Sequence, residues 1–310
     1  MAFDWKEENG VAVLVGYCGD APFVEVPEQW NGLVVREIGE RAFADCLSLQ
    51  EVVLPKSLWT VANYSFAGCR NLKRVALPEG LKEAGAHAFY NCRSLAHLEL
   101  PQGLQSVGDG FLKNCDSLKE VVIAEEKPLS PGVVSLLKNL DGRFLLTVKK
   151  KGFSLVFPAF DYEYAGNAPA MRFFTITHGA GERYRRSIET KGIDFAQYDR
   201  AFVIGVLEEQ AETLLELVRE RLAHPYQLEE EARRQYVLFC KQHLKICITF
   251  ADQTGDLSFL ELMEQEGILT KETVQAAVLA AAEVQNSAIS AYLLDFQLKQ
   301  GGLRKKKFEL

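Results

Sequence analysis

The stretch IGERAFADCLSLQEVVLP, residues Ile38–Pro55, returns in altered form three more times before residue 125. Its apolar residues and its cysteine recur every 23 residues without a gap. The recurring positions are Ile38, Val61, Ala84 and Val107; Phe43, Phe66, Phe89 and Leu112; Cys46, Cys69, Cys92 and Cys115; Leu49, Leu72, Leu95 and Leu118; Val52, Val75, Leu98 and Val121; and Leu54, Leu77, Leu100 and Ile123. A fixed period of this length predicts a solenoid in which each unit buries its apolar face against the next.

Each unit predicts one short strand and one return turn. In the second unit, Val75 and Leu77 alternate with Arg74 and Ala76, which predicts a strand with one buried face. Prolines at 55, 78 and 101 end the first three strands, because proline cannot donate to a ladder. The A-F-x-x-C segment predicts a tight or helical turn whose Phe and Cys point inward.

The units read I-G-x-x-A-F-x-x-C-x-x-L-x-x-V-x-L-P, and over about residues 10–125 they resemble the BspA-like (treponemal-type) leucine-rich repeats. This resemblance implies a leucine-rich-repeat solenoid, in a family whose members are implicated in adhesion and partner binding. The fourth unit departs from the pattern, with Phe111 one position early, Leu112 in the phenylalanine position and Ala124 in place of proline. We therefore expect the array to end there and a cap to begin.

The recurring cysteines have two interpretations. They form either a metal or redox column or a ladder of small core residues. The core ladder is favoured, because zinc ligands converge tetrahedrally from loops and do not form a straight column. The chain holds 7 cysteines and no Cys-x-x-Cys pair, which is typical of free thiols in a reducing compartment. The 5 histidines show no metal-binding spacing, so we expect neither a metal nor a cofactor.

The strand residues that point away from the core predict a partner-binding surface on the concave side of the solenoid. They are Glu51, Val53, Arg74, Ala76, His97, Glu99, Glu120 and Val122. This row contains no cluster of Trp, Tyr or Arg of the kind that dominates binding energy. A solvated sheet therefore remains the alternative to a binding surface.

The middle of the chain changes pattern. PGVVSLLKNL, residues 131–140, predicts a short helix that covers the open end of the array. Strands are expected at Phe144–Val148, Phe153–Phe157 and Arg172–Thr177, and Asp161–Gly166 is expected to be a loop. The segment THGAGERYRR, which includes His178, Glu182 and Arg183, is the only passage suggesting an enzyme, but its glycine spacing fits no phosphate-binding motif.

Helical periodicity begins after Asp199. One apolar stripe ends before His224-Pro225, a longer helix is expected to run through His243 to Phe250, and Asp256 and Thr270 are expected to cap later helices. Two later segments weakly resemble ankyrin-type helical hairpins. We thus expect an α/β leucine-rich-repeat solenoid followed by a small β-containing segment and an all-α helical-hairpin array. The expected domains are 1–127 for the repeats, 128–198 for the capping helix and small β-rich segment, 199–300 for the helices and 301–310 for a basic tail.

Composition narrows the function. The net charge of −7 argues against a nucleic-acid partner, and no apolar run is long enough to insert into a membrane. No signal peptide is visible, so a cytoplasmic location is expected, or the cell surface if a leader has been trimmed. The favoured function is a non-catalytic protein–protein interaction module or scaffold with an unknown protein partner and no small-molecule substrate. A cell-surface adhesin, and an enzyme with a site near His178–Arg186, are the alternatives.

Overall fold

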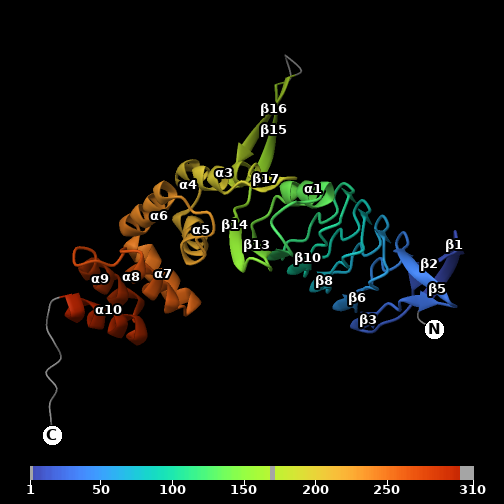
Figure 1. Cartoon of the computed structure of the whole chain (residues 1–310), viewed down its shortest axis with the longest axis horizontal. Coiled ribbons are helices and arrows are strands. Elements are labelled where there is room, and N and C mark those ends of the chain that lie inside the picture. The colour runs from blue at the N-terminus through green and yellow to red at the C-terminus, as the bar shows by residue number, and fades with distance from the viewer. Residues whose placement is uncertain (1–2, 168–171, 301–310) are drawn as a thin grey trace, which may run out of the picture. The chain divides into compact units, whose positions relative to one another are not determined.

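The computed structural model of the chain describes residues 3–167 and 172–300, with the backbone alone for 162–167 and 172–176. It divides into two compact units, Met1–Ala201 and Phe202–Leu310. The first unit contains the solenoid and the second is helical (Figure 1). The basic tail expected at 301–310 lies outside the described residues.

Two sheets run along the solenoid. The first, named here the concave sheet, has the order β14-β13-β12-β10-β8-β6-β3, and the second has the order β1-β2-β5-β7-β9-β11 with β4 paired to β5. The concave strands are β3 (Phe23–Glu25), β6 (Glu51–Val53), β8 (Arg74–Ala76), β10 (His97–Glu99), β12 (Glu120–Ile123), β13 (Phe144–Val148) and β14 (Phe153–Phe157). The others are β1 (Phe3–Glu8), β2 (Val11–Tyr17), β4 (Gln29–Trp30), β5 (Leu33–Ile38), β7 (Thr60–Val61), β9 (Glu83–Ala84) and β11 (Ser106–Val107).

The solenoid extends one coil beyond the four repeats at each end. In the concave sheet β3, β6, β8, β10, β12 and β13 are successive parallel neighbours. β13 continues this stack although its sequence lacks the repeat, and β14 then pairs with it antiparallel. The second, third and fourth repeats also each supply a two-residue strand to the second sheet, ending at Val61, Ala84 and Val107, which the repeat pattern did not predict.

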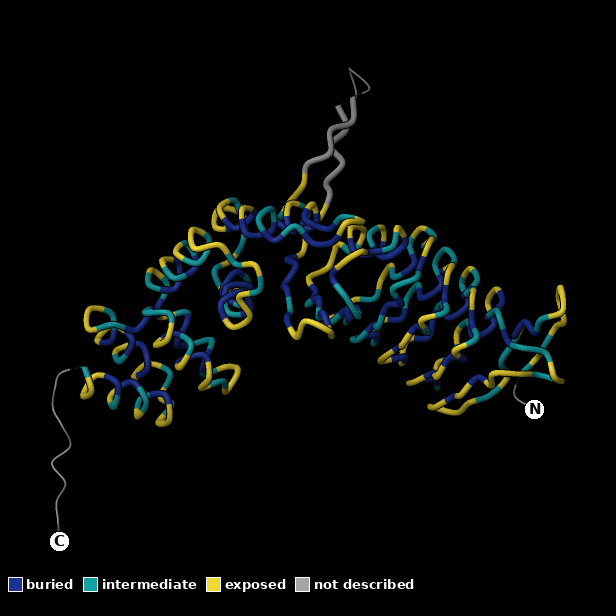
Figure 2. The backbone as a smooth tube through the Cα atoms, viewed as in Figure 1, coloured by how far each residue is buried: buried dark blue, intermediate teal, exposed yellow. Residues whose placement is uncertain are grey.

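A ladder of phenylalanine rings fills the core of the solenoid. Figure 2 shows that buried residues recur along the chain in each coil. Phe43 and Phe66 stack with centroids 4.9 Å apart, and Phe66 and Phe89 stack at 5.0 Å with an interplanar angle of 1°. This spacing is close to the distance between neighbouring strands, so the stacking of rings and the pairing of strands reinforce each other. In the fourth repeat Phe111 instead meets Phe89 edge-on, at 80°.

The middle segment is mostly as the sequence predicts. Helix α1 (Pro131–Asn139) packs against β11, and β13 and β14 have the expected bounds. The expected loop at Asp161–Gly166 is wrong: β15 (Asp161–Asn167) pairs antiparallel with β16 (Arg172–His178). The remaining elements of this unit are α2 (Gly181–Arg185), β17 (Ile188–Glu189), β18 (Gly192–Ile193) and α3 (Phe195–Arg200).

In the second unit, every secondary-structure element among the described residues is a helix. Its helices are α4 (Phe202–Glu208), α5 (Ala211–Ala223), α6 (Glu230–Gln242), α7 (Leu244–Thr254), α8 (Ser258–Gln265), α9 (Val274–Val284) and α10 (Ser287–Gln300). The single long helix expected through His243 is wrong, because the backbone at His243 leaves the helical region and separates α6 from α7. Helix α7 packs on α9, and α9 on α10. The likeness to ankyrin hairpins stays a prediction.

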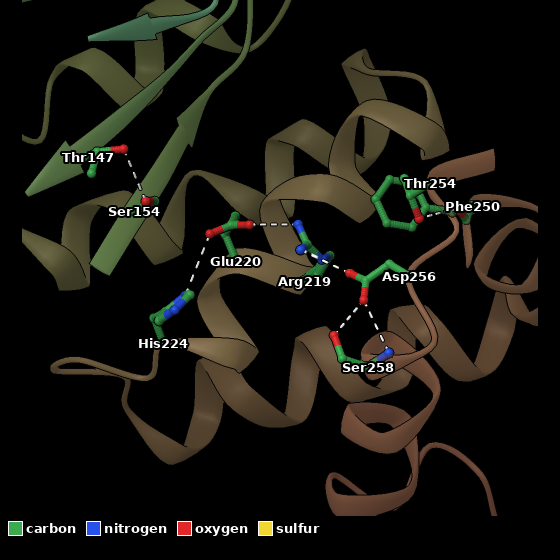
Figure 3. A network of polar contacts seen from close by, with 9 residues as sticks. All are labelled: Thr147, Ser154, Arg219, Glu220, His224, Phe250, Thr254, Asp256 and Ser258. Carbon is green, nitrogen blue, oxygen red and sulfur yellow. Dashed lines mark hydrogen bonds and ion pairs between the residues drawn. The ribbon is translucent and has the colours of Figure 1, made fainter. Parts of the chain in front are cut away.

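A polar network connects two helices of this second unit (Figure 3). Arg219 on α5 contacts Glu220 at 2.7 Å and Asp256 at 3.0 Å. Asp256 in turn accepts a hydrogen bond from the Ser258 N–H at the start of α8, close to its expected capping role. Among the described helices, none combines the length and the apolar character needed to cross a membrane.

Candidate functional site

The predicted partner surface is the solvent-facing side of the concave sheet. Residues paired across parallel strands point to the same side, so the recurring outward positions form two rows. The first row is Phe23, Glu51, Arg74, His97, Glu120 and Leu145, and the second is Glu25, Val53, Ala76, Glu99, Val122 and Thr147. The eight predicted residues therefore lie together on β6, β8, β10 and β12, within the two rows.

The half of the surface on β10 to β14 is occupied by its own polar contacts. His97 Nδ1 lies 2.8 Å from one carboxylate oxygen of Glu120, and the Thr147 hydroxyl donates to the other at 2.8 Å. Thr147 also lies 3.3 Å from the Ser154 hydroxyl (Figure 3). Partial burial raises the pKa of Glu120, but the hydrogen bonds from Thr147 and His97 outweigh it and hold that pKa below its usual value.

Val122 is not available to a partner, contrary to its place in the predicted surface, because it is only 3% exposed. Lys149, the residue after β13, forms an ion pair with Glu99 on β10 at 2.5 Å. β12 lies between these two strands, so the ion pair crosses over it beside Val122. The expectation was wrong because β13, and Lys149 directly after it, add neighbours beside β12 that carry no repeat motif.

The half of the surface on β3 to β8 is open. Glu51, Val53, Arg74 and Ala76 are exposed, and Val53 retains 41% of its accessible area. Phe23 on β3, which was not among the predicted site residues, is 53% exposed in the row of Glu51 and Arg74. Its outward position could have been found from the sequence because Phe23 and Glu25 alternate with the apolar Val24 and Val26. We name Phe23, Glu51, Val53, Arg74 and Ala76 the open concave patch.

Within His178–Arg186, the alternative catalytic segment, Arg185 has a structural role. Arg185 is 2% exposed and donates to the carbonyl oxygens of Pro158 and Gly142, each at 2.6 Å. Its guanidinium also lies over the rings of Phe144 and Phe160. Arg185 therefore joins α2 to the ends of β13 and β14.

Three other polar residues of this region, Glu182, Asp161 and His178, lie on α2 and on the β15–β16 hairpin. Glu182 forms an ion pair with Arg186 one turn along, at 2.9 Å. Asp161 and His178 are exposed and lie opposite each other at the base of the β15–β16 hairpin.

The cysteine column is a set of hydrogen-bonded core thiols. The thiols of Cys69, Cys92 and Cys115 donate to the carbonyl oxygen of the phenylalanine in the preceding repeat, at 3.0, 3.2 and 3.1 Å. Burial raises the pKa of the Cys115 thiol to about 12 and that of Cys92 further. Within the described residues there is no group of three or more His, Cys, Asp or Glu side chains that could hold a metal ion.

Comparison with known proteins identifies the repeat. The model of the BspA-type leucine-rich repeat region matches residues 35–129 in six copies. None of the curated proteins matches the chain.

Solved structures with similarity to the chain include three bacterial leucine-rich-repeat proteins. A T. pallidum leucine-rich-repeat protein is 36% identical over 39% of this chain and 57% of its own, with a TM-score of 0.38. One from Bacteroides capillosus is 24% identical over 39% of this chain and 94% of its own (TM-score 0.36). A leucine-rich cell surface protein from Faecalibacterium prausnitzii is 19% identical over 54% and 57% (TM-score 0.33). The chain thus spans just over half the length of the T. pallidum protein.

Proposed function

We propose, from the premise that residues 35–129 are BspA-type leucine-rich repeats, that the chain is a protein-interaction module that binds a protein partner through the open concave patch. Solenoids present an extended, rigid, curved sheet, and binding there costs little ordering of the backbone. The observation that carries the proposal is the division of the surface. One half satisfies its polar groups internally, whereas the other half exposes apolar Phe23 and Val53 beside charged Glu51 and Arg74.

The composition of the patch suits a protein partner. An exposed aromatic ring can act as an anchor, and Arg74 can pair with a carboxylate of the partner. The short side chains of Val53 and Ala76 let a partner approach the sheet closely. The net charge of the whole chain, −7, disfavours a nucleic acid as the partner.

The test compares affinity captures from the native cell, quantified by mass spectrometry. The bait is the full chain, either unchanged or carrying Val53→Glu together with Ala76→Glu, which adds two charges to the patch. Leu47→Glu is the matched control, because Leu47 is 54% exposed and lies in the turn outside the concave sheet. We expect a partner that is captured by the unchanged chain and by the control but reduced at least tenfold with the double variant.

Equal capture by all three chains would rule out the open concave patch as the binding site. The adhesin alternative uses the same surface but places it outside the cell. Fractionation of the native protein decides between the two: recovery with the cell envelope favours the adhesin, and recovery with soluble intracellular protein favours the internal scaffold.

A further inference from the structure

The return turns of the four repeats form a hydrogen-bonded stack of their own. The turn stack consists of residues 39–46, 62–69, 85–92 and 108–115. In each of the first three turns, three N–H groups donate to three carbonyl groups of the next turn, each 22 residues further along the chain. In the second turn the donors are Tyr64, Phe66 and Gly68, which reach the next turn at 3.0, 2.8 and 2.7 Å.

The donors of the last turn have no backbone acceptor among the residues that the structure describes. By the period of 23, the equivalent N–H groups belong to Gly110, Leu112 and Asn114. None of the three has a hydrogen-bond partner among the described residues. The backbone there is already in the conformation of the other turns, with φ of +63° at Gly110 and +62° at Asn114, matching +56° and +60° at His87 and Asn91.

The other two sides of the last repeat are covered, which leaves the turn side as a recess. β13 pairs with β12 on the concave side, and α1 packs on β11 on the opposite side. Between them lies a cavity of about 680 Å³, lined by Leu112, Asn114 and Cys115 of the turn, Leu136 of α1, and Gly142 and Phe144 beyond it. Its volume lies within the usual ~300–1,000 Å³ of ligand pockets.

We propose that this recess binds a peptide segment of a partner protein, which lies along the last turn as a fifth turn of the stack. The carbonyl groups of alternate ligand residues accept from Gly110, Leu112 and Asn114. The mode is the turn equivalent of strand addition to a sheet edge, where main-chain hydrogen bonds supply affinity and side-chain pockets supply specificity. This site is separate from the open concave patch, so the two proposals stand or fall independently.

The contacts between neighbouring turns inside the stack indicate which side chains the ligand needs, because the ligand would repeat these contacts on the last turn. A bulky apolar side chain of the ligand takes the place above Leu112, as Phe89 packs above Phe66. Three residues later a Cys, Ser or Thr donates to the Leu112 carbonyl, as Cys92 donates to the Phe66 carbonyl at 3.2 Å. Glycine or asparagine suits the two positions where φ is positive.

A single peptide fits this recess better than the end of a second solenoid. At the first turn, the complementary carbonyl groups of Glu40, Ala42 and Ala44 are likewise without partners among the described residues. However, β1 and β2 extend the sheet beyond that turn, as β13 and α1 extend beyond the last one. Two such recessed ends would meet at their projecting edges before the turns came within hydrogen-bonding distance.

The probe is a synthetic peptide with the sequence of the second turn, NYSFAGCR, residues Asn63–Arg70, with blocked ends and under reducing conditions. It is titrated into the ¹⁵N-labelled full chain and followed by amide NMR. We expect saturable shifts centred on the amides of Gly110, Leu112 and Asn114, together with slower hydrogen exchange at these three groups. A scrambled peptide of the same composition should bind at least tenfold more weakly.

Three variants of the full chain test the geometry. Leu112→Pro removes one donor, whereas its matched control Leu112→Ala shortens the side chain but keeps the N–H; we expect the proline variant to bind about tenfold more weakly than the alanine variant. Gly142→Phe places a ring at the wall of the cavity, where an added Cβ meets no atom within 4 Å, and should abolish binding without unfolding the chain. This variant keeps the test decisive if Leu112→Pro fails to fold.

Several results would overturn the proposal. Shifts confined to the concave sheet, or unchanged affinity in Gly142→Phe, would place the peptide elsewhere. If the three amides were already protected from exchange before the peptide is added, either a segment of the same chain or a second copy would occupy the recess. Absence of saturable shifts at these amides up to millimolar peptide would show that the recess holds only water.

Discussion

The phenylalanine ladder makes a quantitative prediction about the stability of the solenoid. Phe66 is fully buried and stacks on rings at both sides, at 4.9 Å on Phe43 and 5.0 Å on Phe89. Replacing a buried Phe by Ala generally costs about 3–5 kcal/mol. Each favourable ring pair contributes about 0.5–1.5 kcal/mol beyond the area it buries, so loss of two pairs puts Phe66→Ala near 4–5 kcal/mol.

Two further substitutions calibrate this value. Phe111 has an edge-on contact to Phe89 at one side and the cavity at the other, so we expect Phe111→Ala to cost about 3 kcal/mol. Phe23 is half exposed at the edge of the concave sheet, and Phe23→Ala should change the free energy of unfolding by less than about 0.5 kcal/mol. The predicted order of cost is therefore Phe66, then Phe111, then Phe23.

Urea denaturation followed by tryptophan fluorescence measures these differences in the solenoid alone. The chain has 3 tryptophans, Trp5, Trp30 and Trp59, and all lie in the first unit. Their fluorescence is therefore insensitive to unfolding of the second, helical unit. The slope of the free energy against urea should be the same in all variants, which confirms that only stability has changed. A cost below about 2 kcal/mol for Phe66→Ala, or a cost equal to that of Phe23→Ala, would refute the idea that the stacked rings hold the repeats together.

Three other features give direct tests. In native protein a thiol reagent at pH 8 should modify exposed Cys18 rapidly. Cys92 is fully buried, and burial raises its pKa, so it should react only after denaturation, as mapped by mass spectrometry. Equal rates at the two thiols would contradict the core ladder. Because hydrogen bonds lower the pKa of folded Glu120 below its usual 4.5, its stabilising contribution should be complete above about pH 4.5 and be lost as the pH falls through the lower folded value. The stability difference between the unchanged chain and Glu120→Gln should therefore shrink below pH 4.5 in urea titrations, and a difference that grows there would contradict this. A lysine at position 185 lacks the planar fork that donates to both the Pro158 and Gly142 carbonyls, so Arg185→Lys should lower the free energy of unfolding by about 1–3 kcal/mol in urea titrations. The control is Arg186→Lys at an exposed neighbouring position, which should cost less than about 0.5 kcal/mol.

The repeat could be predicted in detail because stacking imposes the same environment on every copy. Phe43 stacks on Phe66, and Phe66 stacks on Phe89, the equivalent rings of successive units, so the 23-residue period in the sequence is the spatial period of the core. The second column of strands was missed because Thr60–Val61 and its equivalents are only two residues long, too short for alternation to be visible.

The errors arose where a neighbour distant in sequence decides the environment. Val122 alternates correctly along β12, but its burial depends on Lys149 and on a strand that carries no repeat motif. The break at His243 has no proline or glycine to signal it, and β15 is too polar for its strand to be recognised. The partner surface itself stays a prediction, since the repeat phase gives the direction in which a side chain points but not whether a partner recognises it.

The turn stack also has an electrical consequence. In every turn three peptide groups point the same way, because the carbonyl of one residue faces backward while the N–H of the next faces forward. Each peptide group carries a dipole of about 3.5 D, and dipoles aligned in hydrogen-bonded columns add as they do in a helix. The side of the solenoid therefore behaves like a bundle of three short helices, positive at the fourth repeat and negative at the first. The cavity beside the fourth repeat therefore lies at the positive end of this dipole, and Asp109, Asp116 and Asp141 are among its lining residues.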